Sequence, residues 1–203
     1  MEFTRLLVKK AQNNDLSAFE ELVRLYQNKV YSLCNHLAGN HADAQDLAQE
    51  AFIRAYRAIG SFRNEADFGT WLHRITVNVW LNLKRKKNGQ QPLSLDEPHR
   101  GSDGGEIGRE VASEDGDPLR ALEEKELRGL VRVALDSLSE EHRAVLVLRE
   151  IEGYSYEEVS RMLGCSLGTV KSRLSRAREA MKRKVTELTR ENGEHLPAGK
   201  ERR

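Results

Sequence analysis

The 203-residue sequence has little cysteine, no long apolar run and almost no net charge. Its two cysteines, Cys34 and Cys165, are far apart, which argues against a disulfide framework and fits a reducing compartment. No stretch approaches the roughly 20 apolar residues that a bilayer span requires, and the N-terminus lacks the apolar core of a signal peptide. We therefore expect a cytoplasmic protein without membrane insertion.

The overall charge gives no sign of nucleic-acid binding, because 33 Lys and Arg residues are balanced by 32 Asp and Glu residues. The charges are nevertheless segregated along the chain. The charged residues of 96–126 are mostly acidic, whereas residues 84–87 and 171–190 are strongly basic. The average therefore conceals two basic segments.

Alternation of apolar and polar residues, the pattern of half-buried strands, is missing, and apolar residues recur at helical spacing instead. The sequence thus predicts an all-α fold. The predicted helices of the first half cover residues 3–11, 17–39, 42–59 and 68–87. For the second of them, Ser17 and Glu20 predict an N-terminal capping box, and Gly39 predicts the C-terminal end.

Helical patterning stops between Asn88 and Leu119, where Gly, Pro, Ser and acidic residues predominate. Such a composition cannot bury enough apolar surface to fold alone. We therefore expect two small helical domains joined by an acidic flexible linker. The predicted boundaries are 1–88 for the first domain, 89–118 for the linker, 119–190 for the second domain and 191–203 for a flexible tail.

The second domain carries the pattern of a helix-turn-helix. Ser155 and Glu158 predict a capping box that opens a short helix, Gly164 predicts its left-handed stop, and Ser166 can cap the next helix. That helix is expected to run from about Leu167 to Lys184. One of its faces is apolar and is expected to pack inward, with Leu167, Val170, Leu174, Ala177 and Met181.

The opposite face of this helix is polar and basic, which suits the DNA major groove. Its members are Lys171, Ser172, Ser175, Arg176, Arg178 and Lys182. A solvated basic helix is the alternative interpretation, but it does not explain the short capped helix and the tight turn before it. We expect the first four side chains to contact bases or the adjacent backbone, and the later cations to contact phosphates.

In the predicted helix at 68–87, aromatic and basic residues interleave. Trp71, Ile75 and Val79 recur at spacing four and are expected in the core. The remaining arc could line a pocket for an unstacked base, for which Asn78 would supply an amide.

Three segments, 43–56, 68–78 and 154–178, resemble the extracytoplasmic-function sigma factors of the bacterial sigma-70 family in the family's order. The resemblance covers nearly the whole chain. It implies that the first domain binds core RNA polymerase and the promoter −10 element, while the helix-turn-helix reads the −35 element. It also implies transcription initiation at a stress or envelope regulon, with an anti-sigma factor as a further partner.

The resemblance assigns roles to particular residues. The core-polymerase-binding residues would be Asp43, Asp46, Gln49, Glu50 and Arg54. The −10 DNA-binding residues would be Phe68, Ile75, Asn78, Lys84 and Arg85, with residues 63–67 selecting the base that is flipped out. The −35 DNA-binding residues would be Lys171, Ser172, Ser175, Arg176 and Arg178.

No catalytic residue, cofactor or metal is expected. Cys34, His36 and His41 lack a recognisable fourth ligand. Extruding a base costs a few kcal/mol and stacking it returns about 1–3 kcal/mol, so we expect that the free protein does not stably open duplex DNA.

Two other classes of protein are less consistent with the sequence. A DNA recombinase would need a nucleophile near clustered arginines, and no such group is apparent in the first domain. A dimeric transcriptional regulator would leave the match at 43–56 unexplained.

Overall fold

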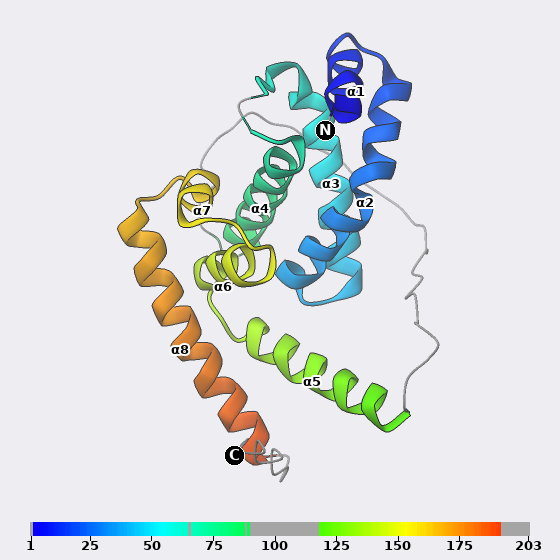
Figure 1. The fold of residues 1–203 in the computed structure, drawn as a ribbon. Coiled ribbons are helices and arrows are strands. Elements are labelled where there is room, and N and C mark those ends of the chain that lie inside the picture. The colour runs from blue at the N-terminus through cyan, green and yellow to red at the C-terminus, as the bar shows by residue number, and fades with distance from the viewer. Residues whose placement is uncertain (1, 65, 88, 90–117, 192–203) are drawn as a thin grey trace, which may run out of the picture.

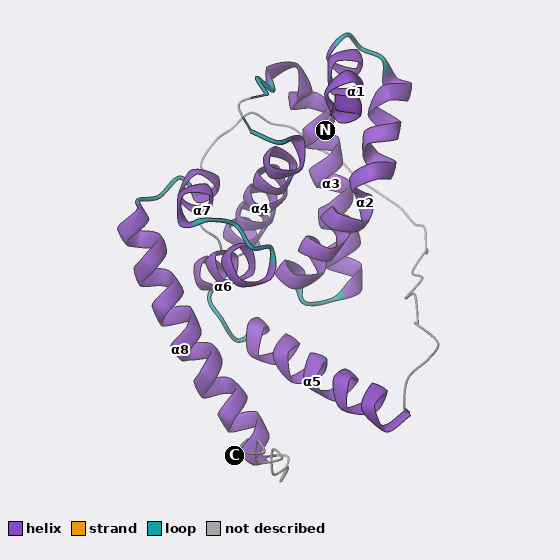
Figure 2. Cartoon of the chain, in the orientation of Figure 1, coloured by secondary structure: helices purple, strands orange, loops and turns teal. Residues whose placement is uncertain are grey.

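The computed structural model describes residues 2–64, 66–87, 89 and 118–191, which form helices and loops without strands (Figures 1 and 2). The all-α prediction is therefore confirmed. Residues 90–117 of the predicted linker and 192–203 of the predicted tail lie outside the described residues. None of the helices in the described part combines the length and apolar character that a bilayer span requires.

The first half of the chain forms a bundle around a leucine-rich core. Its helices are α1 (Glu2–Gln12), α2 (Leu16–Ala38), α3 (His41–Ala58), the 3-10 turn η1 (Ile59–Ser61) and α4 (Phe68–Lys87). Their inward faces follow the predicted periodicity, since Leu22, Leu37 and Leu47 are at most 1% exposed. This bundle fixes the outward faces of α3 and α4.

The beginning of α2 differs from the prediction. Asp15, rather than Ser17, is the N-cap, because its Oδ1 accepts the Ala18 N–H at 3.1 Å. Ser17 lies inside the first turn and donates its hydroxyl to the same carboxylate at 2.6 Å. The predicted capping box of Ser17 and Glu20 is therefore wrong. Gly39 does end the helix, with a left-handed φ of 85°.

The second half contains two long helices and a compact group of short ones. They are α5 (Pro118–Asp136), α6 (Glu140–Leu146), the π-helical turn η2 (Val147–Ile151), α7 (Tyr156–Leu163) and α8 (Leu167–Glu191). In Figure 1, α5 and α8 extend from the group formed by α6 and α7. Because Ala144 and Val145 are fully buried beneath α8, α6 supports the long C-terminal helix.

The two halves are docked against each other through α2 and α4 on one side and α6, η2 and α7 on the other (Figure 1). The Arg143 guanidinium, 6% exposed, donates to the Leu37 carbonyl at 2.9 Å and pairs with Asp136 at 2.9 Å. The same guanidinium lies 5.9 Å from the centroid of the Trp80 ring. The sequence predicted two domains but not this contact between them.

The surface between the two halves also contains a cluster of ionisable side chains. The Tyr154 hydroxyl lies 2.9 Å from Nδ1 of His73, and a Glu152 oxygen lies 3.8 Å from the same nitrogen. The other Glu152 oxygen lies 4.0 Å from Nδ1 of His36. Burial lowers the pKa of His73 to about 4 and also lowers that of His36, whereas it raises the pKa of Glu152. Burial thus favours the neutral form of each group.

Candidate nucleic-acid interface

The short helix α7 begins and ends as predicted. The Ser155 hydroxyl accepts the Glu158 N–H at 3.2 Å, and the Glu158 carboxylate accepts the Ser155 N–H at 2.8 Å, which completes a capping box. The bond from the Ser155 N–H, followed by a contribution from the Ser155 side chain, lowers the pKa of Glu158 because it stabilises the charged carboxylate. Gly164 has a φ of 61°, in the left-handed region that a stop of this kind requires.

The turn between α7 and α8 is fixed by two serine hydroxyls. Ser160 donates to the Cys165 carbonyl at 2.5 Å, and Ser166 accepts the Thr169 N–H at 3.1 Å. The second bond is the predicted cap of the following helix. That helix continues to Glu191, beyond the predicted end at Lys184.

One face of α8 packs on α6 as well as on α7, whereas only the preceding helix was expected as its partner. Val170, Leu174 and Ala177 are at most 1% exposed, as the apolar spacing predicts. Met181 is half-buried. Leu167 is 40% exposed, so its predicted burial is wrong, because it is the first residue of the helix.

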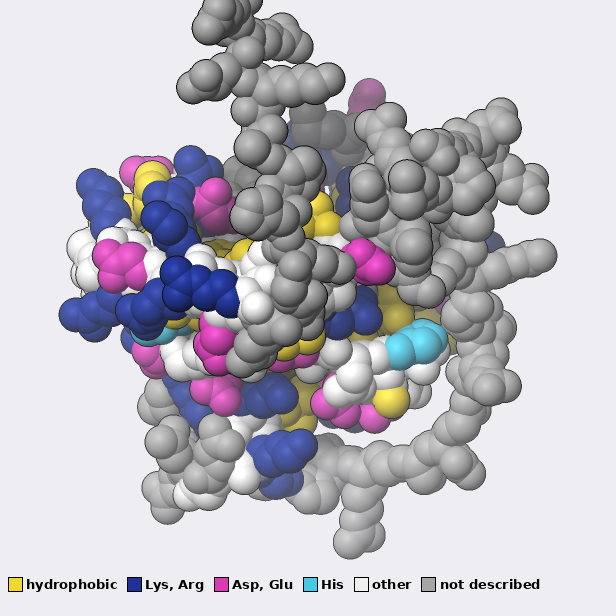
Figure 3. All heavy atoms as spheres, turned by 90° about the horizontal axis from the view of Figure 1, so that it is seen from below, with side chains coloured by type: hydrophobic (Ala, Val, Ile, Leu, Met, Phe, Trp, Pro, Cys, Tyr) yellow, Lys and Arg dark blue, Asp and Glu magenta, His cyan; other side chains and the backbone are white. Residues whose placement is uncertain are grey.

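The opposite face of α8 brings the predicted side chains together on the surface. Lys171, Ser172, Ser175 and Arg176 are all exposed and occupy its first two to three turns. In Figure 3, Lys and Arg side chains gather on the side on which Figure 1 shows α8. Such a row of hydrogen-bonding and cationic groups can meet base edges and phosphates.

Arg178 is exposed, but it is not free in this structure, since its Nη2 pairs with Glu150 at 2.5 Å. Arg173 pairs in a similar way with Glu141 at 2.6 Å. Both acidic partners belong to the segment of α6 and η2. The sequence pattern missed these pairs, because a periodicity within α8 does not reveal partners on another element.

The five candidate polymerase-binding residues occupy the outward side of α3. Asp43, Asp46 and Gln49 are exposed, while Glu50 and Arg54 are partly exposed and form an ion pair at 2.6 Å. The same helix exposes two large apolar side chains that the prediction omitted. These are Ile53, 39% exposed, and Tyr56, 41% exposed. Ile53 and Tyr56 follow Asp46 and Gln49 at helical spacings of three and four residues, so the sequence could have placed them on the same face of the helix.

The −10 candidates lie at different depths along α4. The Phe68 ring is 4% exposed and packs with the rings of Tyr26 and Trp71, at 5.2 and 5.4 Å between centroids. Ile75, about two turns further along the helix, is half-buried. The prediction of core positions holds fully for Val79, 1% exposed, and partly for Trp71 and Ile75, which pack against the core from its edge.

The other −10 candidates, Asn78, Lys84 and Arg85, are partly exposed along the same helix. The structure therefore brings Ile75 and Asn78 onto neighbouring turns, and places the two cations nearer the C-terminal end of α4. Phe68 is separate from them, because its ring faces the bundle.

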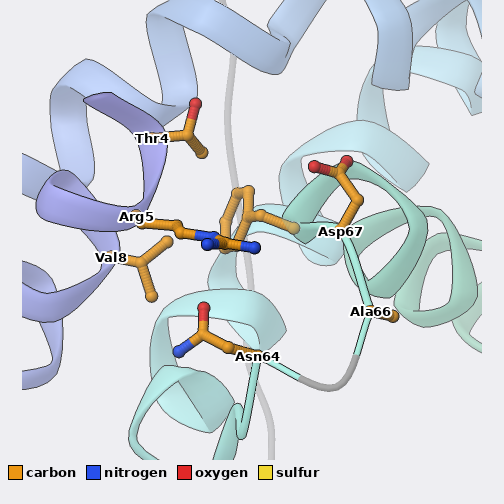
Figure 4. A pocket seen from close by; sticks show the side chains of 7 residues that line it. Thr4, Arg5, Val8, Asn64, Ala66 and Asp67 are labelled. Atoms are coloured by element: carbon orange, nitrogen blue, oxygen red, sulfur yellow. The ribbon is translucent and has the colours of Figure 1, made fainter. Parts of the chain in front are cut away.

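A pocket of about 260 Å³ lies beside the N-terminal end of α4 (Figure 4). It is lined by Thr4, Arg5, Val8, Asn64, Ala66, Asp67 and Phe68. Three of these belong to the loop that was expected to select a base. The residues of α1 were not predicted, because the polar and apolar pattern of that helix indicates only an amphipathic element. In the described residues, no three His, Cys, Asp or Glu side chains form a group that could hold a metal ion.

Two family models match the chain, Sigma-70 region 2 over residues 22–90 and Sigma-70, region 4 over residues 128–181. The chain is 41% identical over 190 residues to the ECF RNA polymerase sigma-E factor of Escherichia coli strain K12, an alignment that covers 92% of this chain and 96% of that relative. The chain belongs to the extracytoplasmic-function (ECF) sigma factors of the sigma-70 family. The RNA polymerase sigma-H factor of Pseudomonas aeruginosa is 39% identical to this sigma factor over 188 residues, with 91% and 95% of the two chains covered.

Two solved structures share the fold of this chain. CnrH, in complex with the cytosolic domain of CnrY, superimposes on this sigma factor with a TM-score of 0.59 at 23% identity, covering 94% of this chain and 99% of that one. RpoE of Bartonella quintana, in complex with the anti-sigma factor NepR, gives a TM-score of 0.58 at 23% identity, covering 83% and 96%. The predicted family resemblance is confirmed, and α1 of this sigma factor precedes both matched regions.

Proposed function

We propose that this sigma factor divides the task of starting transcription between its two domains. The first domain binds core RNA polymerase and the −10 element, and the second reads the −35 element. The observation that supports this most directly is the exposed row of Lys171, Ser172, Ser175 and Arg176 on the second helix of a capped helix-turn-helix. We take the domains as residues 1–88 and 119–190, with a linker between them and a tail after them.

Core polymerase would bind on the outward side of α3. Asp43, Asp46, Gln49, Glu50 and Arg54 form its charged part. Ile53 and Tyr56 add apolar area in the same patch, which suits a protein partner better than a nucleic acid because protein interfaces are enriched in aromatic and apolar side chains. The Glu50–Arg54 pair would orient both charges towards the partner.

The −10 element would be held along α4 and at the pocket of Figure 4. Ile75 and Asn78 supply an apolar surface and an amide for a displaced strand, and Lys84 and Arg85 supply charge for its phosphates. Phe68 would meet a flipped base only at the pocket that it lines. Stacking and extrusion nearly cancel, so the free protein should leave duplex DNA closed.

The protein would act by binding, without catalysing a reaction of its own, and in the cytoplasm, where core polymerase is found. An anti-sigma factor is a proposed further partner. Support for it comes from the two structural relatives, which were solved with the cytosolic domain of CnrY and with NepR. A stress or envelope regulon is its proposed target, as the family resemblance implies.

The decisive experiment combines the full chain with core RNA polymerase and a promoter template, and maps the transcripts. A sigma factor yields transcripts that begin at a defined site without any other factor. Core polymerase alone is the background control, and Asp46→Lys should reduce holoenzyme formation. Transcripts that are equally abundant without the chain would contradict the proposal.

Arg176→Ala and Lys182→Ala should change −35 recognition in different ways. Truncating a base contact costs about 1–3 kcal/mol at its own base pair, whereas losing a phosphate contact weakens all sequences alike. Arg176 lies within the first turns of α8 and Lys182 lies further along. Transcription from a set of single-base −35 variants should therefore give an altered profile for Arg176→Ala and a uniform decrease for Lys182→Ala. Identical profiles would refute this division of roles.

A further inference from the structure

We propose that helix α1 is part of the device that holds the displaced −10 base. In this arrangement Gln12 positions the loop of the pocket, and Arg5 faces the base from the opposite wall. The inference rests on the proposed function, because it presumes that the pocket receives a base. It goes beyond that function in assigning a role to a helix that precedes the matched sigma-70 regions.

Gln12 joins α1 to the segment that leads into the loop. Its side-chain amide donates to the Ile59 carbonyl at 3.0 Å and to the Phe62 carbonyl at 2.7 Å. The last carbonyls of a helix have no partner within that helix, and one amide group carries two N–H donors. Gln12 thus bonds to the Ile59 carbonyl, which also accepts the Phe62 N–H at 3.1 Å, and to the Phe62 carbonyl just after η1. These bonds tie α1 to the point where the chain leaves Phe62 towards Asn64.

The pocket lies between α1 and this loop. Thr4, Arg5 and Val8 form one wall, and Asn64, Ala66 and Asp67 form the other. Figure 4 shows the Arg5 side chain extending across the pocket between these walls. Val8 is 1% exposed, so α1 is anchored in the core directly beneath the pocket.

The charged side chains suit an unpaired nucleobase. The Asp67 carboxylate accepts the Gly69 N–H at 2.9 Å, which holds it in place on the loop side. A carboxylate can accept a hydrogen bond from a base, and a guanidinium can donate to a base edge or stack on its face. Since extrusion and stacking nearly balance, one additional contact from Arg5 would change retention of the base substantially.

The test measures binding of full-length holoenzyme to forked promoter templates that carry each of the four bases, or an abasic site, at the displaced position. The variants are Arg5→Met, which keeps the apolar stem, and Gln12→Met, which keeps length but removes both donors. Lys9→Met, at an exposed position of α1 outside the pocket, is the matched control. We expect about tenfold weaker binding for Arg5→Met and Gln12→Met on templates with a base, and no difference from wild type on the abasic template.

The outcomes separate the inference from the proposed function. If wild-type holoenzyme does not bind the forks at all, or binds base-containing and abasic forks equally, base capture itself is wrong. If wild type discriminates but both variants match Lys9→Met, the role of α1 is refuted. An equal loss on abasic and base-containing templates would show a general structural defect and would also overturn the proposal. Arg5 is exposed, so Arg5→Met remains informative even if Gln12→Met fails to fold.

Discussion

Leu174→Ala is expected to lower the free energy of unfolding by about 2–5 kcal/mol. The side chain is 1% exposed and lies on the face of α8 that packs on α6 and α7. Truncation would leave a cavity beneath the helix that we propose reads the −35 element. Urea denaturation followed by circular dichroism measures the change, and −35-dependent transcription should fall with it because the helix loses its support.

Ser175→Ala is the matched control for this prediction. Ser175 is the next residue, is exposed, and lies on the proposed DNA-reading face. Its truncation should alter stability by no more than about 0.5 kcal/mol, as for most surface positions. Similar denaturation midpoints for Leu174→Ala and wild type would show that α8 does not depend on this contact.

Acidification from pH 6.5 to pH 4 should destabilise the docked structure through His73. The imidazole is buried, and its pKa is about 4 in the folded protein against an ordinary value near 6.5. The unfolded chain therefore takes up the proton first, and stability is lost as the pH falls through this window. The contribution of His73 alone is about 3 kcal/mol.

Neighbouring groups modify this response. His36 acts in the same direction, because burial also lowers its pKa, whereas Glu152 opposes both, because burial raises its pKa. Lys29 strengthens the effect on His73, and Asp67 weakens it. The net change should therefore be smaller than the contribution of His73 alone.

His73→Asn tests the assignment, because the amide can still bond to Tyr154 but does not titrate. The variant should lose less stability than wild type between pH 6.5 and pH 4 in urea titrations. His41→Asn removes an exposed imidazole from the start of α3 and serves as the control. An unchanged pH dependence in His73→Asn would show that another group dominates.

Features whose determinants are close in sequence could be predicted. The capping box of Ser155 and Glu158 and the left-handed stop at Gly164 each depend on atoms within one or two turns. The exposed row on α8 follows from the same periodicity that buries Leu174. At the start of α2, Asp15 and Ser17 are both plausible caps, and Asp15, which follows a turn at Asn14 with a φ of 65°, is the one that the structure uses.

Features that depend on distant partners could not be predicted. The hydrogen bond from Arg143 to Leu37 joins residues 106 positions apart, and nothing in either local pattern identifies the other. The pair of Glu150 and Arg178 joins different elements for the same reason. The pocket wall that includes Arg5 could not be predicted either. It depends on how α1 packs against the loop, and the residue pattern within α1 carries no information about that packing.

Helix α4 carries two surfaces on the same cylinder. His73 and Trp80, two turns apart, meet Tyr154 and Arg143 of the second domain, while Ile75 and Asn78 lie on the arc proposed for DNA. Positions that are close in sequence on α4 are therefore constrained by different partners, the second domain on one side and DNA on the other. Sequence differences between relatives along α4 should therefore be compared by the angular position of each residue around the helix axis. Residues next to each other in sequence lie on different surfaces, whereas residues one full turn apart lie on the same surface and are subject to the same constraint.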